Sequence, residues 1–306
     1  MSDSPPGPRR LVVPDSAAGE RLDQFLAGPL GSRAQAQRMI DAGLVSVAGR
    51  PRPKRHLLRA GESIIVSPEP ARRGAASAVP AGGRDPFRIA YEDDHLLVVD
   101  KPAGVVVHPA RGHREGTLVQ ALGPRAAGGD DPERAGIVHR LDRDTSGLLV
   151  VARSVEAHRR LRTALAERRI VREYLALVEG RPPARSGTID APLGRDRRLR
   201  TRMSIDTDEP REARTHFVIE EALDGATLMR IRLETGRTHQ IRAHLEAIGH
   251  PVCGDPVYGT PGRFGLARQF LHAAHLGFDH PFGAGRIDVS SPLPGDLLDA
   301  LRLAGG

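Results

Sequence analysis

Two carboxylates, Asp142 and Asp144, stand in a charged turn just before an unbroken apolar run of strand length. The stretch reads HRLDRDTSGLLVVA over residues 139 to 152, and its pattern predicts that the acids lie at the mouth of a buried strand. Arginines flank them, and nearby positive charge favours an ionised carboxylate. Such a group can act as a nucleophile. The alternative is that Asp142 or Asp144 closes the turn by bonding the backbone.

The sequence of this stretch resembles the central motif of the RluA family of pseudouridine synthases. In that family the Asp after Arg-Leu is the catalytic nucleophile, so the resemblance assigns the role to Asp142 rather than Asp144. It also implies that Arg140 fills the space that the target base leaves in the RNA stack. His139 is predicted as a further RNA contact.

Two later stretches carry the other candidate residues. Residues 171 to 180 alternate as a strand, which puts Tyr174 on one face with Ala176; a lone Tyr there is most often part of the core. REYLALV nevertheless resembles the family motif in which this Tyr lies in the active site against the target base. The family usually has a Lys near the start of this motif, and Arg172 takes that position here.

LETGRTHQIRAHL, residues 233 to 245, predicts the end of a strand at Gly236 and then a helix. It resembles a family motif whose second Arg pairs with the catalytic Asp, which implies that role for Arg242. Arg237 and His239 are predicted RNA contacts. His239 and His244 also suggest a metal site, but no third ligand has suitable local spacing, so we predict no metal. HPVCGDPVYG, residues 250 to 259, matches family wording too.

Other elements must position these groups. Two apolar runs between residues 91 and 109 flank KPAG and predict a strand, a turn and a strand, a segment that resembles the first family motif. Lys101 is predicted to contact phosphate, although a Lys at a turn is usually just solvated. Ser154 begins a predicted helix with an apolar face at Ala157, Leu161, Ala164 and Leu165. Residues 191 to 205, APLGRDRRLRTRMSI, resemble the family's basic loop between two strands.

The N-terminal part reads as a separate module. Residues 1 to 16, rich in Pro, predict a disordered arm. Residues 19 to 67 contain two short helices, the second expected from a cap at Ser32 to Gly43, and then strands. These residues resemble the S4 RNA-binding domain, a small α/β module, so Arg33, Arg38 and Arg55 are predicted RNA contacts. The alternative is a solvated charged face.

Residues 68 to 86 are dominated by Pro, Ala, Gly and Arg, without periodicity, and predict a flexible linker to a domain over residues 87 to 306. The resemblance implies an α+β fold for this second domain: a long, bent, mostly antiparallel sheet flanked by helices, with a basic cleft. The predicted architecture is therefore a small RNA-binding domain, a linker and a catalytic domain.

Composition supports these expectations. The chain of 306 residues has a net charge of +7 and a pI near 10.5, which suggests a polyanionic partner; the alternative is that the basic surface serves solubility alone. A single cysteine, Cys253, excludes an internal disulfide framework. No apolar run suggests export or membrane insertion, so we expect a cytoplasmic protein. A carboxylate-based glycoside hydrolase is a further alternative, but it would need paired acids and an aromatic platform for the sugar. The chain has three Tyr and no Trp, which argues against this class of enzyme.

The resemblance implies isomerisation of uridine to pseudouridine in structured RNA. The N1–C1′ bond breaks, the uracil rotates, and it rejoins through C5, without a cofactor. Three routes remain open for the carboxylate: attack on C1′, attack on the base, or deprotonation of the sugar. Within the family an S4 domain favours large-subunit ribosomal RNA, with transfer RNA as the alternative. A noncatalytic RNA-binding or ribosome-assembly factor is the other alternative; the expected partner is a ribosome precursor, and a monomer is the default.

Overall fold

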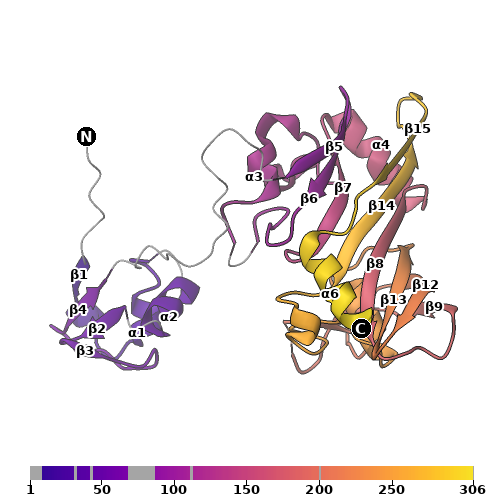
Figure 1. Cartoon of the computed structure of the whole chain (residues 1–306). Coiled ribbons are helices and arrows are strands. Elements are labelled where there is room, and N and C mark those ends of the chain that lie inside the picture. The colour runs from indigo at the N-terminus through magenta and orange to yellow at the C-terminus, as the bar shows by residue number, and fades with distance from the viewer. Residues whose placement is uncertain are drawn as a thin grey trace. The chain divides into compact units, whose positions relative to one another are not determined.

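The computed structural model describes residues 9–30, 33–41, 44–67, 87–110, 113–199 and 201–305. The chain divides into two compact units, Met1–Ala76 and Ser77–Gly306, called here the N-terminal and C-terminal units (Figure 1). Each unit has its own hydrophobic core. The predicted linker, residues 68 to 86, lies outside the described residues.

The N-terminal unit packs two helices and a 3-10 turn on a small antiparallel sheet with the strand order β1-β4-β2-β3. Leu22, Leu26, Val47 and Ile64 are fully buried in its core. Its elements are β1 (Arg9–Val12), η1 (Asp15–Ala17), α1 (Leu22–Phe25), α2 (Arg33–Asp41), β2 (Val45–Val47), β3 (Arg50–Pro51) and β4 (Ser63–Val66).

The predicted disordered arm over residues 1 to 16 is wrong from residue 9 onward. Residues 9 to 12 form β1, which pairs with β4, and Val13 next to it is buried at 1% exposure. The prolines around this short segment hid its alternation, because a strand of four residues gives too few positions to establish a period. The predicted helix cap at Ser32 and stop at Gly43 lie outside the described residues.

The C-terminal unit is built on a nine-stranded sheet with the order β5-β6-β7-β14-β8-β13-β12-β9, and β15 pairs with β14. Among the described pairings of this sheet, β7 with β14 is parallel and the rest are antiparallel, as expected. The strands are β5 (Arg88–Glu92), β6 (Leu96–Lys101), β7 (Ser146–Ala152), β8 (Val171–Glu179), β9 (Ser186–Asp190), β12 (Arg214–Leu223), β13 (Ala226–Leu233), β14 (Leu271–Asp279) and β15 (Arg286–Ser290).

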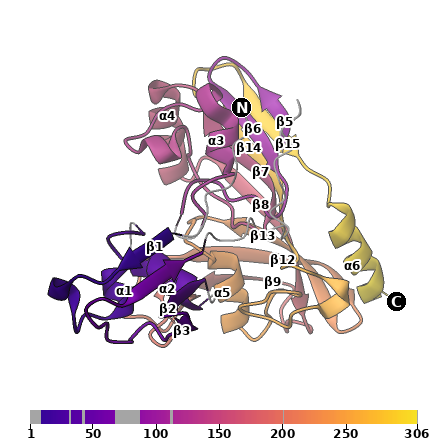
Figure 2. The same cartoon turned by 90° about the vertical axis from the view of Figure 1, so that its left-hand side faces the viewer.

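Helices lie along this sheet, as Figure 2 shows, and a separate hairpin forms within the predicted basic loop. Every residue of β7 is buried, which explains its unbroken apolar run. Ser154 caps α4 as predicted, and its side chain accepts from Ala157 N at 3.1 Å. The remaining elements are α3 (Leu118–Leu122), η2 (Gly123–Arg125), η3 (Pro132–Arg134), α4 (Val155–Ala166), β10 (Gly194–Arg195), β11 (Met203–Ser204), α5 (Gln240–Ala247), η4 (Arg263–Gly265) and α6 (Gly295–Gly305).

One predicted strand is absent. After β6 the apolar residues 105 to 107 form an irregular loop and not a second strand. Val107 is buried by packing into the core from this loop. Across the described ranges no helix has the length and apolar character needed to span a membrane.

Candidate active site

A pocket of about 800 Å³ opens where the loop before β7, the face of β8 and the start of α5 converge. Asp142, Tyr174 and Arg242 all line it, although they come from three separate stretches of sequence. Arg140, Arg237, His139 and His239 also line it. Asp144 does not belong to this lining.

The cation that pairs with Asp142 is Arg242, which lies 100 residues later in the sequence. Arg242 Nη1 donates to Asp142 Oδ2 at 3.0 Å. The neighbouring Arg143 pairs instead with Asp144, at 2.8 Å. The flanking Arg143 therefore does not pair with Asp142, and the cation that is hydrogen-bonded to Asp142 comes from α5.

Arg242 is fixed from behind by a second carboxylate. Its Nε and Nη2 donate to the two oxygens of Asp255 at 2.6 and 2.9 Å, and its guanidinium lies 5.0 Å from the ring centre of Tyr258. Burial opposes the charge on Arg242, but the hydrogen bond to Asp255 and the charges of Asp142 and Asp255 outweigh it and raise the pKa of Arg242. The guanidinium is thus a permanent cation in the pocket wall.

Asp255 was not singled out from the sequence. It is fully buried, and its Oδ1 also accepts from the backbone N–H groups of Val257 and Tyr258. The only sequence signal was its place in the stretch of residues 250 to 259 that matches family wording. Its bidentate geometry makes it the positioning partner of Arg242.

Tyr174 lies on the pocket-facing side of β8 and is 4% exposed. Burial raises the pKa of its phenol; the charge of Arg172 opposes this rise and that of Asp142 adds to it. The hydroxyl therefore carries its proton at neutral pH. The phenol ring can offer an apolar face to a base and a polar tip to a proton transfer.

Two histidines shape the pocket in neutral form. His139 Nε2 accepts from Val150 N at 3.3 Å, and burial, together with the charge of Arg172, lowers the pKa of His139 to about 3. His239 begins α5 with a left-handed backbone, φ 55°, and its Nδ1 lies 3.1 Å from the hydroxyl of Tyr258. Burial lowers the pKa of His239 as well.

Lys101 does not reach RNA, and the prediction of a phosphate contact there is wrong. Its side chain is fully buried, and Nζ donates to the carbonyls of Pro102, Val105 and Arg143 at 2.8 to 3.0 Å. Burial lowers the pKa of Lys101 to about 7, against the attraction of Asp144 and Asp142. Lys101 ties the loop after β6 to the turn that carries Asp142.

The other predicted RNA contacts are distributed between the two units. Arg140 is exposed at the pocket, and no hydrogen bond or ion pair with a described residue holds its guanidinium. Arg237 is exposed and donates to Glu212 O at 2.9 Å.

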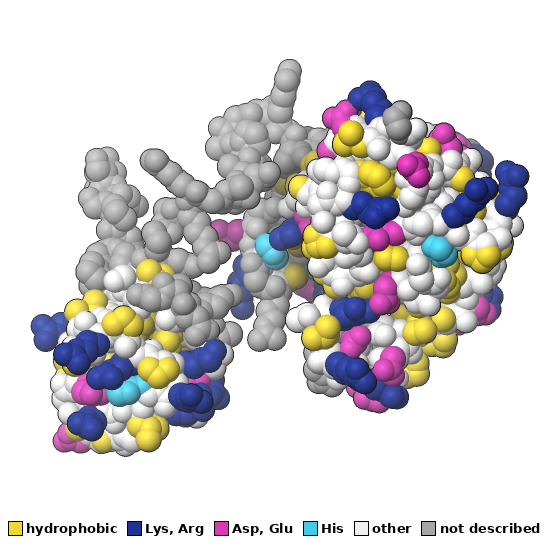
Figure 3. All heavy atoms as spheres, turned by 60° about the horizontal axis from the view of Figure 1, so that its bottom comes forward, with side chains coloured by type: hydrophobic (Ala, Val, Ile, Leu, Met, Phe, Trp, Pro, Cys, Tyr) yellow, Lys and Arg dark blue, Asp and Glu magenta, His cyan; other side chains and the backbone are white. Residues whose placement is uncertain are grey.

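In the N-terminal unit Arg33 pairs with the buried Asp23 at 3.0 Å, and Arg55 is exposed. The side chain of Arg38 lies outside the described part of the chain. Figure 3 shows Lys and Arg side chains spread over the visible face of the N-terminal unit.

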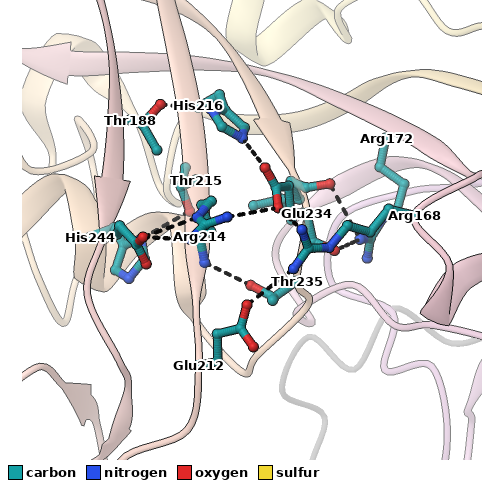
Figure 4. A network of polar contacts seen from close by, with 12 residues as sticks. Arg168, Arg172, Thr188, Glu212, Arg214, Thr215, His216, Glu234, Thr235 and His244 are labelled. Carbon is teal, nitrogen blue, oxygen red and sulfur yellow. Dashed lines mark hydrogen bonds and ion pairs between the residues drawn. The ribbon is translucent and has the colours of Figure 1, made fainter.

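Ion pairs close one side of the pocket (Figure 4). Arg168, in a left-handed backbone with φ 60°, bridges Glu212 at 3.1 Å and Glu234 at 2.6 Å. His216 Nε2 lies 2.6 Å from the second oxygen of Glu234. This network joins the end of α4 to β12 and β13, and fixes that part of the rim.

His244 is hydrogen-bonded within the protein and is not placed as a metal ligand. Its two ring nitrogens lie 2.9 Å from Thr215 Oγ1 and from Ala191 O. Within the ranges that the structure covers, no cluster of three or more His, Cys, Asp or Glu could hold a metal ion. The pocket chemistry available from the described residues is that of a carboxylate, a phenol and several guanidinium groups.

Comparisons with known proteins identify the family of the chain. The RNA pseudouridylate synthase family matches residues 95 to 247, and the S4 domain matches residues 20 to 64. An "Uncharacterized RNA pseudouridine synthase" of Chloroflexus aurantiacus is 48% identical, over 96% of this chain and 93% of that protein. A "Ribosomal large subunit pseudouridine synthase D" of Nitrosomonas europaea is 44% identical, over 95% and 87%.

Among solved structures, "Human RNA Pseudouridylate Synthase Domain Containing 1" superposes with a TM-score of 0.57 at 30% identity, covering 70% of this chain and 86% of that one. The chain therefore belongs to the RNA pseudouridylate synthase family and is an enzyme that isomerises uridine to pseudouridine in RNA.

Proposed function

We propose that this enzyme modifies uridine in large-subunit ribosomal RNA, with Asp142 as the catalytic carboxylate. The observation that carries the proposal is the ion pair between Asp142 and Arg242 inside the pocket, with Arg242 held from behind by Asp255. The permanent cation at 3.0 Å fixes the direction in which the carboxylate points.

Asp142 supplies the nucleophile or base in each of the three open routes. Its side chain keeps 18% exposure, so substrate can reach it, whereas that of Asp255 is at 0%. This difference assigns separate roles to the two partners of Arg242: Asp142 reacts and Asp255 positions. Arg242 orients Asp142 in all three routes.

Tyr174 complements the carboxylate. Its ring lies in the pocket wall with a protonated hydroxyl, so it would pack against the uracil and could help remove the C5 proton. Its buried position on β8 keeps this ring fixed. The target base has to leave its stack to reach this depth, at a cost of a few kcal/mol. Arg140, exposed and unpaired among the described residues at the rim, would fill the vacated space.

The choice of RNA rests on the relatives and on the N-terminal unit. Relatives from Nitrosomonas europaea, Xanthomonas campestris and Pseudomonas aeruginosa, at 41 to 44% identity, carry the name "Ribosomal large subunit pseudouridine synthase D". The S4 unit adds a basic surface that suits structured RNA. Large-subunit ribosomal RNA, within a ribosome precursor, is therefore the proposed substrate.

The experiment compares Asp142→Asn with Asp144→Asn on a transcript of large-subunit ribosomal RNA labelled with tritium at C5 of uridine. We expect Asp142→Asn to release no tritium above background while it still binds the RNA. Asp144→Asn should keep most activity, because Asp144 pairs with Arg143 outside the pocket. Activity in Asp142→Asn together with inactivity of Asp144→Asn would overturn the assignment, and an inactive wild type on this transcript would overturn the proposed RNA.

A further inference from the structure

Arg172 is a buried cation without a counter-ion among the described residues. It is 5% exposed, and none of the ion pairs between described residues includes it. Nη2 donates only to two backbone carbonyls, of Leu233 at 3.4 Å and Glu234 at 3.2 Å. Nε is buried and has no hydrogen-bond partner in the described part of the chain. A buried guanidinium with an unused donor is costly, so its presence calls for an acceptor that arrives with the substrate.

The chain leaves room for this guanidinium and fixes its place. A Cβ at Gly236 would lie 2.8 Å from Arg172 Nη1, so a larger residue there would displace the end of this side chain. Figure 4 shows Arg172 beside Arg168 near the network around Glu234. Arg172 and Tyr174 point to the same face of β8, about 7 Å apart along the strand, and both line the pocket. The guanidinium therefore lies next to the ring against which the uracil is proposed to pack.

The pocket is electrically polarised. On the side of α5, Asp142 and Asp255 share one cation, Arg242, which leaves that cluster with an excess negative charge. On β8, Arg172 contributes a positive charge that no described carboxylate compensates. Breaking the N1–C1′ bond creates the matching polarity in the substrate: the sugar loses electron density and the uracil gains it.

We propose that Arg172 is a catalytic residue that binds the carbonyl oxygens of the target uracil and stabilises the negative charge they gain during the reaction. This inference rests on the proposed function, because it takes the uracil to lie against Tyr174. A donor aimed at developing charge in a water-poor pocket is among the strongest catalytic devices. The phosphates of the RNA backbone are better matched to the exposed Arg140 and Arg237 at the rim than to a side chain at 5% exposure.

The electrons and protons balance without any other reactant. When Asp142 attacks C1′, a carboxylate oxygen bonds to C1′ and the N1–C1′ bond breaks; its electron pair passes to the uracil and spreads over N1, O2 and O4. After rotation, C5 supplies the pair for the new C5–C1′ bond, and the pair of the Asp142–C1′ bond returns to the carboxylate. The C5 proton then leaves to a base and N1 takes up a proton, so the product is neutral. If Asp142 instead adds to the base, the negative charge again forms on the ring oxygens, so the role of Arg172 is the same.

The test uses full-length protein and single-turnover kinetics on two transcripts of an RNA that the wild type converts, one made with uridine and one with 5-fluorouridine. Fluorine withdraws electrons and stabilises the uracil anion by itself. For Arg172→Gln we expect the first-turnover rate of N1–C1′ cleavage at saturating RNA to fall about 10²-fold or more on uridine. On 5-fluorouridine the fall should be at least about 10-fold smaller. Arg181→Gln, which removes an exposed charge outside the pocket, is the matched control and should leave both rates unchanged.

Affinity and folding separate the alternatives. The dissociation constant and its salt dependence should stay within about 2-fold of wild type, because the variant keeps every bond to the phosphates. An unchanged rate with a salt slope reduced by about 0.7 to 0.9 would show that Arg172 binds a phosphate and would overturn the proposal. An equal fall in rate on both RNAs would overturn it as well. If Arg172→Gln does not fold, Arg172→Met decides by the same comparison of the two RNAs, because it removes the charge and every donor and keeps a side chain that fills a buried site. An inactive wild type would count against the proposed RNA and not against Arg172.

Discussion

In the active site the guanidinium of Arg242 is hydrogen-bonded to two carboxylates, and these differ in exposure and in the number of hydrogen bonds they accept from it. Asp142 accepts one hydrogen bond from Arg242 and is partly exposed; Asp255 accepts two and is fully buried. Loss of the first charge leaves Arg242 with a bidentate partner. Loss of the second leaves a buried cation with a single partner at the pocket surface.

This asymmetry predicts opposite consequences for two matched substitutions. Asp255→Asn should lower the free energy of unfolding of the C-terminal unit by about 3 kcal/mol, as expected when a buried ion pair loses one partner. Asp142→Asn should lower it by less than about 1 kcal/mol, because the site is partly solvated. Both variants should be nearly inactive. Chemical denaturation of the two variants beside wild type measures the difference, and equal destabilisation would show that Asp142 is as structural as Asp255.

At the residue level, the sequence was informative where a short stretch carries the whole signal. The pairing of Asp142 with Arg242 was implied by the family resemblance of two motifs, each of them contiguous, and the structure shows it. Asp255 was missed because its role depends on a contact that only the folded chain creates. Lys101 was placed wrongly because a Lys at a turn is usually exposed, while its burial depends on three backbone carbonyls that the tertiary fold brings to Nζ.

At the level of elements, the long periodic segments were predictable and the loop after β6 was not. β7, β8 and α4 follow their apolar patterns. Residues 105 to 107 have the same apolar character, but the chain after Lys101 curves so that carbonyls of Pro102 and Val105 reach Nζ. An apolar run alone does not distinguish a strand from such a buried loop.

The buried ammonium of Lys101 predicts a pH dependence of stability. The pKa of Lys101 is about 7 in the folded protein and about 10.4 in an unfolded chain. Between these values the unfolded chain binds a proton that the folded chain has released, so the free energy of unfolding rises with pH. The slope is at most about 1.4 kcal/mol per pH unit for one proton.

Denaturation of wild type and Lys101→Met from about pH 6 to about pH 10 tests this prediction. The difference in unfolding free energy, wild type minus variant, should be flat below a pH of about 7 and should increase above it. Since Met leaves the three carbonyls without a donor, the variant should also be less active through disorder in the turn that carries Asp142. A difference that stays constant over the whole range would show that Lys101 keeps its proton throughout.

At the level of the whole molecule, the chain combines two units with separate cores. The core of the N-terminal unit draws on residues 11 to 66, and those of the C-terminal unit on residues from 87 onward. The residues assigned to the reaction, Asp142, Tyr174, Arg172 and Arg242, all belong to the C-terminal unit. The N-terminal unit contributes basic side chains such as the exposed Arg55.

This division predicts that removal of residues 1 to 67 separates affinity from chemistry. A tethered RNA-binding unit raises the local concentration of the catalytic unit at its target without entering the pocket. The truncated enzyme should bind structured RNA more weakly, and its log–log salt slope should flatten by about 0.7 to 0.9 for each phosphate that it no longer neutralises. Its maximal single-turnover rate should change far less than its affinity. Kinetics across a salt series measure both quantities, with Arg55→Gln in the full chain as a milder version of the same change. A collapse of the maximal rate at unchanged affinity would mean that the N-terminal unit shapes the active site itself.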